Sequence, residues 1–306
     1  MSVIDVVRGC DMPSNTVRSG YPNSKAMRIA GRVVRTLASI HPRLASLVVN
    51  RLFFMTFSRP PSAAERRALS NSERLSIPFR GRDLAAYAWG AGPTVILLHG
   101  WASNAGSMHH FVVPLLEAGF RVFAFDAPAH GASPGRMTDA VQYGEAIRVA
   151  IEMNNPVDGV IAHSFGAISM LLLLAEEPGL AIKAAVANNP PAQLSTLIDI
   201  FADMLELPES VLNGLRRNIQ SRFGRPVEYF SLKNHIQSVT TPGMVIADRN
   251  DTLVRFEDTQ YLASLWPGAR LLVTDGLGHQ GALQDSSVIE EVVSFIRGKS
   301  SSVSAA

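Results

Sequence analysis

The residues with the clearest chemical potential lie between positions 159 and 167. An apolar run at residues 160–162 ends abruptly near Ser164, and a helix-forming run follows from residue 167 to 175. This order predicts a strand, a sharp turn and a helix with the serine at the apex, which is the geometry of a nucleophile elbow. A serine hydroxyl is a poor nucleophile near neutral pH, so catalysis also requires a base, an acid that orients the base, and donors for an oxyanion.

The elements that must position Ser164 alternate between strands and helices. Residues 75–79 and 84–89 flank a short polar turn and predict a two-stranded hairpin. The later strands are apolar throughout, which is typical of a parallel sheet covered by helices on both faces, and the predicted fold class is therefore α/β. These strands are expected at residues 94–98, 121–125, 160–162, 184–187, 244–247 and 270–273, with helices near 108–118, 139–153, 167–176, 257–265 and 287–296.

One interval, residues 190–239, breaks this alternation. It contains no convincing strand and only helical patterns, at about 194–205, 211–219 and 228–235. An insertion of this length is too long for an ordinary connection in an α/β sheet, so we expect a helical cap over the active site. Apolar residues such as Phe201, set against basic residues such as Arg222, predict an apolar pocket with a basic surface.

Residues 1–70 form an N-terminal helical extension. Apolar residues recur at helical spacing over 24–40, Pro42 interrupts the pattern, and a second helix is expected over 43–57. Residues 1–60 contain nine Lys and Arg but only two Asp and Glu, so their net charge is +7 against −5 for the rest of the chain. We expect these helices to pack on the catalytic domain. Contact with an anionic membrane surface, or a homodimer formed through them, is the alternative.

Composition limits the class of protein. The chain has 306 residues, of which 47% are hydrophobic, and a single cysteine, Cys10, which fits a globular protein in a reducing compartment. Residues 1–20 lack the apolar core of a signal peptide, and no segment is apolar enough to span a membrane. No basic cluster with interleaved aromatic residues indicates nucleic-acid binding. We therefore expect a cytoplasmic protein that binds no nucleic acid, with a disordered Ser/Ala-rich tail at residues 299–306.

Four blocks of sequence, taken in order, resemble the α/β-hydrolase superfamily in its capped, esterase-like serine-hydrolase form. Leu98-His99-Gly100-Trp101 resembles the oxyanion loop, and the DAPAHGAS run at residues 126–133 resembles the loop that follows it. Ala162-His163-Ser164-Phe165-Gly166 resembles the elbow, and Gly276-Leu277-Gly278-His279 resembles the histidine loop. The resemblance covers about residues 75–298 and implies an α/β-hydrolase core at 71–189 and 240–298, interrupted by the cap.

The resemblance assigns the chemistry to three side chains. The family's order along the chain is nucleophile, acid and base, so Ser164 is the expected nucleophile and His279 the expected general base. The expected acid is Asp251, in the cluster that follows an apolar strand, and Asp248 is the alternative. The family's other acid position falls at residues 188–189, which are both asparagine and carry no carboxyl group.

The resemblance also implies an oxyanion hole made by the backbone N–H groups of Trp101 and Phe165, whose side chains would wall the acyl pocket. Ala162 stands where the family has glycine, and a small residue suffices there. His163, beside the nucleophile, is expected to pack or to line the pocket. No metal-ligand spacing and no nucleotide-binding glycine motif occur, so we expect neither a metal nor a cofactor.

The expected function is that of a carboxylesterase that acts on a small-molecule ester through an acyl-enzyme intermediate. Thioester or lipid-ester hydrolysis and acyl transfer use the same three groups and stay open as alternatives. A non-catalytic ligand-binding protein on the same scaffold is a further alternative. The serine at the elbow argues against the dehalogenase and epoxide-hydrolase branches of the family, which resemblance implies carry an aspartate there.

Overall fold

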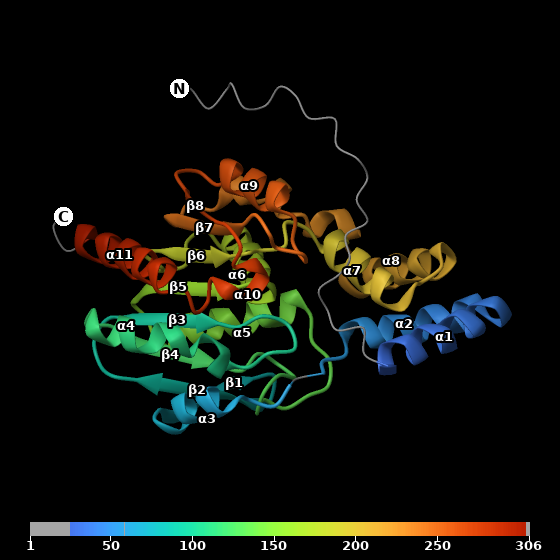
Figure 1. Cartoon of the computed structure of the whole chain (residues 1–306), viewed down its shortest axis with the longest axis horizontal. Coiled ribbons are helices and arrows are strands. Elements are labelled where there is room, and N and C mark those ends of the chain that lie inside the picture. The colour runs from blue at the N-terminus through green and yellow to red at the C-terminus, as the bar shows by residue number, and fades with distance from the viewer. Residues whose placement is uncertain (1–24, 58, 304–306) are drawn as a thin grey trace.

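The computed structural model describes residues 25–57 and 59–303. An eight-stranded sheet runs through the molecule in the order β1-β2-β4-β3-β5-β6-β7-β8 (Figure 1). The pairs β1·β2 and β2·β4 are antiparallel and the remaining pairs are parallel, which confirms the predicted α/β class. The strands are β1 (Glu73–Phe79), β2 (Arg82–Trp89), β3 (Thr94–Leu98), β4 (Arg121–Phe125), β5 (Val157–His163), β6 (Ala185–Asn188), β7 (Gly243–Asp248) and β8 (Arg270–Thr274).

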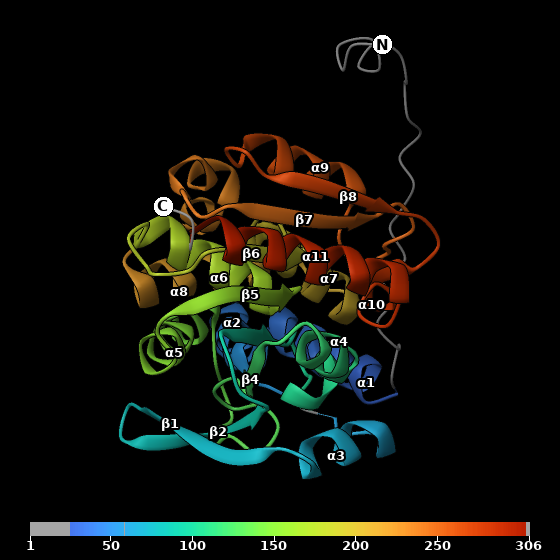
Figure 2. The ribbon, with the colours of Figure 1, turned by 90° about the vertical axis from the view of Figure 1, so that its left-hand side faces the viewer.

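Helices cover both faces of the sheet, as Figure 2 shows for α4 and α11 on one face and α5 and α6 on the other. The central strands are buried on both sides because successive side chains point to opposite faces: Ile96 packs in one apolar core and Leu97 in the other. The helices of these layers are α3 (Ala63–Ser70), α4 (Val112–Glu117), α5 (Ala140–Met153), α6 (Phe165–Glu176), α9 (Phe256–Leu265) and α11 (Ser286–Val303), with the 3-10 helix η2 (Ala105–Phe111) preceding α4.

Four helices stand together beyond the ends of the strands. The segment between β6 and β7 contributes α7 (Leu194–Leu205) and α8 (Glu209–Phe223), followed by the short 3-10 helices η3 (Val227–Phe230), η4 (Leu232–Asn234) and η5 (Ile236–Ser238). The N-terminal segment contributes α1 (Lys25–Ile40) and α2 (Pro42–Phe54). The sequence predicts that α1 and α2 pack on the catalytic domain. In the structure the two helices pack on each other, and beyond that contact α1 packs on α7 and α2 on α8 (Figure 1).

Glycines permit this close packing between the N-terminal and cap helices. A Cβ atom at Gly31 of α1 would lie 2.5 Å from the carbonyl oxygen of Leu205, at the end of α7. A Cβ atom at Gly214 of α8 would lie 2.0 Å from the Ser46 hydroxyl of α2. A larger side chain at Gly31 or Gly214 would push the helices apart. The contact therefore depends on a glycine in the N-terminal segment and on another in the cap.

Several boundaries differ from the expected ones. The second N-terminal helix ends at Phe54 rather than residue 57, because Met55 leaves the helix and pairs with Met137 in an antiparallel bridge. The expected disordered tail at residues 299–306 is wrong as far as the structure describes it, since α11 continues to Val303 and the Ser300 hydroxyl donates to Asp158. Among the described residues, no helix is long and apolar enough to cross a membrane.

Candidate active site

Ser164 occupies the sharp turn between β5 and α6. Its φ angle is +49°, a region that costs energy for a residue with a side chain, and its N–H donates to the carbonyl oxygen of Asn188 at 2.9 Å. The helix behind the turn lies close to the preceding loop: a Cβ atom at Gly166 would lie 2.6 Å from the carbonyl oxygen of His99. The strand, the turn and the glycine together lift the serine hydroxyl clear of the sheet, as the sequence predicts.

The structure brings His279 and Asp251 to this serine. Nε2 of His279 lies 2.9 Å from Oγ of Ser164, and Nδ1 lies 2.6 Å from Oδ2 of Asp251. The other carboxylate oxygen of Asp251 accepts the backbone N–H groups of Leu253 and Val254, at 2.7 and 3.0 Å, which fixes the orientation of the carboxylate. With Nδ1–H donating to Asp251, Nε2 is free to accept the serine proton.

Asp248, the alternative acid, has a different set of contacts. Its buried carboxylate accepts hydrogen bonds from the Thr274 hydroxyl and from the N–H groups of Asn250, Leu277 and Gly278, at 2.7 to 3.0 Å. Burial favours the protonated form, but these four donors outweigh it and hold the pKa of the Asp248 carboxyl below its usual range. Asp248 therefore secures the loop that carries the histidine.

Asn189 joins the same two loops, a contact that the sequence does not predict. Its side-chain oxygen accepts the N–H of Asp248 at 3.1 Å, while its Nδ2 donates to the carbonyl oxygens of Gly278 and His279 at 3.3 and 3.2 Å. Its φ angle of +45° is one that asparagine tolerates better than most residues. The sequence shows an asparagine where the family can place an acid, and that is the only signal that could have drawn attention to it.

Two buried histidines hold the loop that follows β3. Nδ1 of His99 lies 2.8 Å from the carbonyl oxygen of Gly100, and Nε2 of the same ring accepts the N–H of Ala127 at 3.0 Å. His130 accepts the N–H of Ala102 at Nε2, at 3.1 Å. Burial lowers the pKa of His99 to about 4 and, together with the neighbouring His99, the pKa of His130 to about 3. Both rings are neutral near pH 7, as the acceptor role of each Nε2 requires.

The predicted oxyanion donors lie beside the serine. Trp101 sits in the turn after β3, and the preceding Gly100 is so close to the elbow that an added Cβ atom would lie 3.4 Å from Cβ of Ser164. Phe165 is the first residue of α6, so its N–H has no acceptor within the helix. The rings of Trp101 and Phe165 meet edge to face with centroids 4.8 Å apart. Both residues line the cavity above Ser164.

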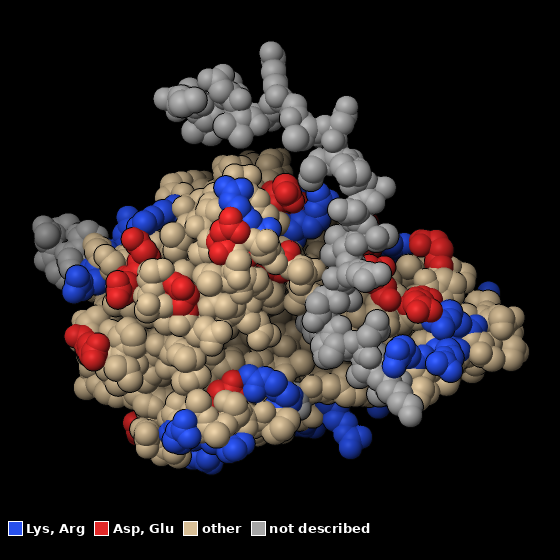
Figure 3. Space-filling view, in the orientation of Figure 1, with Lys and Arg blue, Asp and Glu red and all other residues tan. Residues whose placement is uncertain are grey.

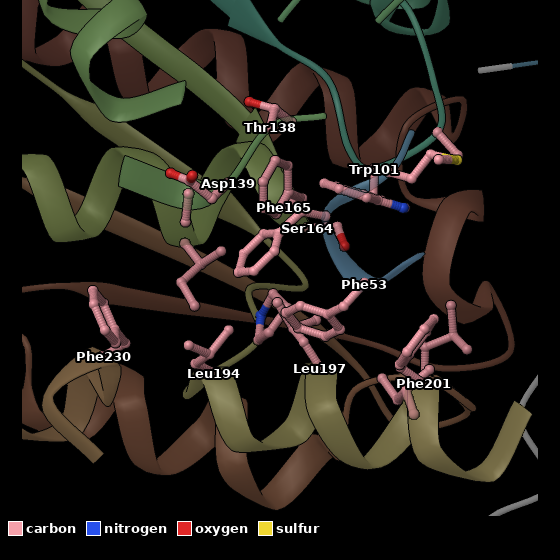
Figure 4. A pocket seen from close by; sticks show the side chains of 18 of the residues that line it. Phe53, Trp101, Thr138, Asp139, Ser164, Phe165, Leu194, Leu197, Phe201 and Phe230 are labelled. Atoms are coloured by element: carbon pink, nitrogen blue, oxygen red, sulfur yellow. The ribbon is translucent and has the colours of Figure 1, made fainter. Parts of the chain in front are cut away.

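That cavity has a volume of about 690 Å³, within the range of small-molecule sites. Figure 4 shows side chains of α7, including Leu194, Leu197 and Phe201, pointing across it toward Ser164. Among the described residues of the lining, polar groups come from Thr138, Asp139, Ser164, His279 and the indole N–H of Trp101. The other described lining residues are apolar and come from the core, the cap and the N-terminal segment.

A model of the alpha/beta hydrolase family matches residues 95–295, which is more than half of the chain. The chain belongs to this family. A serine hydrolase-like protein of Homo sapiens is 27% identical over 175 residues, which cover 55% of this chain and 83% of the human protein. The match spans only 33% and 52% of two other serine hydrolase-like relatives.

Two further comparisons cover more of this alpha/beta hydrolase. The pimeloyl-[acyl-carrier protein] methyl ester esterase of Vibrio vulnificus is 24% identical over 250 residues, which cover 70% of this chain and 98% of that enzyme. A solved structure of a Pyrococcus furiosus esterase superimposes with a TM-score of 0.60 at 25% identity, covering 80% of this chain and 97% of the other.

The N-terminal segment of this alpha/beta hydrolase precedes the residues that the family model matches, and it contacts the loops around Ser164. The N–H of Arg59 donates to the carbonyl oxygen of Ala102 at 3.3 Å, beside the predicted oxyanion donor. The Thr56 hydroxyl donates to the carbonyl oxygen of Ala129 at 2.6 Å, and Thr138 N–H donates to that of Phe54. Phe54, Thr56 and Arg59 therefore brace two of the loops that surround Ser164.

His163, next to the nucleophile in sequence, does not contact Ser164 as a base. Its ring is buried, with its centroid 4.9 Å from that of His279, and its Nδ1 has no hydrogen-bond partner among the described residues. Burial, with a contribution from His279, lowers the pKa of His163 well below its usual value. His163 is thus a neutral packing residue behind His279, and it is absent from the cavity lining.

Proposed function

We propose that this alpha/beta hydrolase is a carboxylic ester hydrolase in which Ser164 is the nucleophile, His279 the general base and Asp251 the acid that orients it. The observation that carries the proposal is the pair of contacts made by one imidazole, 2.9 Å to the serine oxygen and 2.6 Å to the aspartate, at the floor of an apolar cavity. The similarity to proteins described as esterases supports the same chemistry.

In the proposed reaction, His279 Nε2 takes the Ser164 proton as Oγ attacks the ester carbonyl carbon. The carbonyl oxygen becomes an oxyanion, which accepts hydrogen bonds from the N–H groups of Trp101 and Phe165. The tetrahedral adduct then expels the alcohol, which leaves with the proton from His279 and gives an acyl-serine ester. A water molecule then attacks the acyl-serine carbonyl carbon while His279 takes its proton. The adduct breaks down by expelling Ser164 Oγ, which regains a proton from His279, and the carboxylic acid is released.

Asp251 serves two functions in this proposal. Its carboxylate keeps the proton on Nδ1 of His279, so that Nε2 faces the serine as an acceptor. It also stabilises the imidazolium that forms when the serine proton is transferred. The two backbone N–H groups that bind its second oxygen hold it in place for both functions.

A fluorophosphonate probe tests the proposal, because it forms a covalent bond only with an activated serine. We expect the wild-type protein to be labelled and to hydrolyse p-nitrophenyl acetate, and Ser164→Ala to do neither. Ser169→Ala is the matched control, since that hydroxyl lies one turn along α6 and donates to the Phe165 carbonyl oxygen instead. An unlabelled wild-type protein, or labelling that persists in Ser164→Ala, would refute the serine-hydrolase mechanism and favour a ligand-binding role.

A further inference from the structure

The N-terminal extension forms one wall of the cavity above Ser164. Leu52 and Phe53 from α2, and Met55 and Phe57 from the segment after it, line the cavity. Figure 4 shows the Phe53 ring between Ser164 and the side chains of α7. Phe53 meets Phe201 of α7 edge to face, with centroids 5.3 Å apart. Without these side chains the cavity would be open on this side, so the space that receives the substrate is complete only when the extension is in place.

The lining excludes charged acyl groups. Among the described residues that line the cavity there is no Lys or Arg that could pair with a carboxylate. The carboxylate of Asp139 is already engaged, because it accepts hydrogen bonds from Gln142 and from Arg222 at 2.8 Å. A charged or strongly polar acyl chain would lose its hydration there without gaining a partner.

We infer that the N-terminal extension and the cap together form a binding site for an uncharged alkyl acyl chain, and that the substrates are esters of medium-chain fatty acids. This inference rests on the proposed function of Ser164. A cavity of about 690 Å³ holds roughly twenty groups the size of a water molecule, so an octanoyl or decanoyl chain fits within it. Each methylene that such a chain buries is worth about a fourfold gain in binding.

The experiment measures kcat/KM for p-nitrophenyl acetate, butyrate, octanoate and decanoate. We expect the wild-type value to rise by about tenfold or more from acetate to octanoate, because six more carbons enter the apolar cavity. Phe53→Trp and Leu197→Trp each put a larger side chain into the cavity, one from the extension and one from the cap. Both should lower the octanoate-to-acetate ratio by about fivefold or more, since acetate needs only the space next to Ser164.

Leu47→Trp is the matched control, because Leu47 lies on the exposed face of the same helix as Phe53 and does not line the cavity. Its octanoate-to-acetate ratio should equal that of the wild type. Acetate hydrolysis in each variant reports that the protein has folded. Failure of the wild type to hydrolyse any ester at Ser164 would overturn the proposed function itself. Hydrolysis with the same chain-length ratio in Phe53→Trp as in Leu47→Trp would overturn only the acyl-site inference.

A separate observation concerns the outer face of α1 and α2, which we call the apolar outer face. It consists of large apolar side chains with exposed fractions of 46% to 75%: Ile29, Val33, Ile40, Leu44 and Leu47. Ile29, Val33 and Ile40 recur at helical spacing along one side of α1, so the exposure is a continuous stripe. Side chains of this size are normally buried, and such a stripe indicates a contact surface.

The charges around the apolar outer face indicate which kind of partner it contacts. Residues 25–57 contain six Lys and Arg and no Asp or Glu. Arg35 pairs with Glu206, whereas Arg28, Arg32, Arg43 and Arg51 are exposed and make no ion pair with any described residue. Figure 3 shows basic side chains at the end of the molecule where Figure 1 places these helices, with acidic side chains next to them on the side of α7 and α8. Two copies meeting through this face would place like charges against each other, which disfavours a dimer.

We propose that the apolar outer face docks on an anionic lipid surface, with the apolar stripe entering the interface and the arginines meeting lipid phosphates. Sedimentation with vesicles of phosphatidylglycerol and phosphatidylcholine tests this. We expect the full chain to bind these vesicles about tenfold or more tightly than pure phosphatidylcholine, and Val33→Glu with Leu47→Glu to abolish binding. The control is Val113→Glu on α4, an equally exposed apolar residue elsewhere.

Equal binding by the Val33→Glu, Leu47→Glu protein and the Val113→Glu control would overturn the docking proposal. So would a wild type that stays in the supernatant with both vesicle types. A dimer seen by light scattering that the same two substitutions dissociate would show that a second copy covers the face instead. Acetate hydrolysis by every variant verifies that the altered proteins are folded.

Discussion

The ring of Phe53 meets the ring of Phe201 at an interplanar angle of 73°, with 5.3 Å between their centroids. One belongs to the N-terminal extension and the other to the cap, two segments that are far apart in the chain. Both rings line the cavity above Ser164. In this alpha/beta hydrolase, α2 of the N-terminal extension and α7 of the cap therefore line the site together, and the cap does not do so alone.

The two aspartates after β7 should respond differently to the same substitution. Asp251→Asn presents an amide to Nδ1 of His279 and favours the wrong tautomer, so we expect kcat to fall roughly 1,000-fold to 10,000-fold with little change in Tm. Asp248→Asn places an NH₂ group against backbone N–H donors and should lower the free energy of unfolding by about 2–3 kcal/mol. Steady-state kinetics and thermal melts on both proteins distinguish the roles, and a reversed pattern would identify Asp248 as the acid.

Asn189 should act on catalysis through the position of the histidine loop. Asn189→Gly tolerates the φ angle of +45° but removes three hydrogen bonds to Asp248, Gly278 and His279. We expect a loss of stability of about 2 kcal/mol and a drop in kcat of about tenfold, with KM nearly unchanged. Chemical denaturation and kcat measured on the same sample test this. A stability loss without any change in kcat would limit Asn189 to a structural role.

The elbow should tolerate no side chain at position 166. Gly166→Ala would bring a Cβ atom to 2.6 Å from the His99 carbonyl oxygen and 3.1 Å from that of Leu98. Backbone atoms cannot move away easily, so we expect a destabilisation of about 1–3 kcal/mol or more and a large loss of kcat. Gly179→Ala is the control, because nothing lies within 4 Å of its added Cβ atom. Equal melting temperatures for the two variants would contradict the close approach.

Stability should fall when the pH drops below about 6.5. The unfolded chain protonates His99 and His130 near that pH, whereas the folded protein does so only near pH 4 and 3. The unfolded state then binds more protons, and each histidine lowers the free energy of unfolding by about 1.4 kcal/mol per pH unit, or about 2 kcal/mol at pH 5. Urea denaturation of His99→Gln should show a pH 7 to pH 5 difference that is about 2 kcal/mol smaller than in the wild type. If the free energy of unfolding changed equally between pH 7 and pH 5 in the wild type and in His99→Gln, the folded protein would bind a proton at His99 as readily as the unfolded chain does.

The sequence predicts the fold because its signals are local. Apolar strands such as residues 94–98 and 121–125 appear with those bounds in the structure, since burial on both faces demands an unbroken apolar run. The elbow at Ser164 is predicted for a similar reason, because the change from apolar strand to helix occurs within a few residues. The structure also brings His279 and Asp251 to that serine, although their chemical roles remain a prediction.

Contacts between distant segments are what the sequence does not reveal. The apolar faces of α1 and α2 indicate that they pack on something, but helical spacing carries no information on the partner, and the partner is mainly the cap. The hydrogen bonds of Asn189 to Gly278 and His279 join residues about ninety positions apart. Such links depend on where the loops meet in space, and no local pattern marks them.

The segment after α2 is joined to the core by the hydrogen bond from Arg59 to Ala102 and the bridge from Met55 to Met137. The family model matches the chain only from residue 95. In the proposed mechanism, the groups that cleave the ester all lie inside the matched region, whereas the acyl site takes part of its lining from residues that precede it. Substitutions at Leu52, Phe53, Met55 or Phe57 should therefore alter which esters are accepted while Ser164, Asp251 and His279 stay in place.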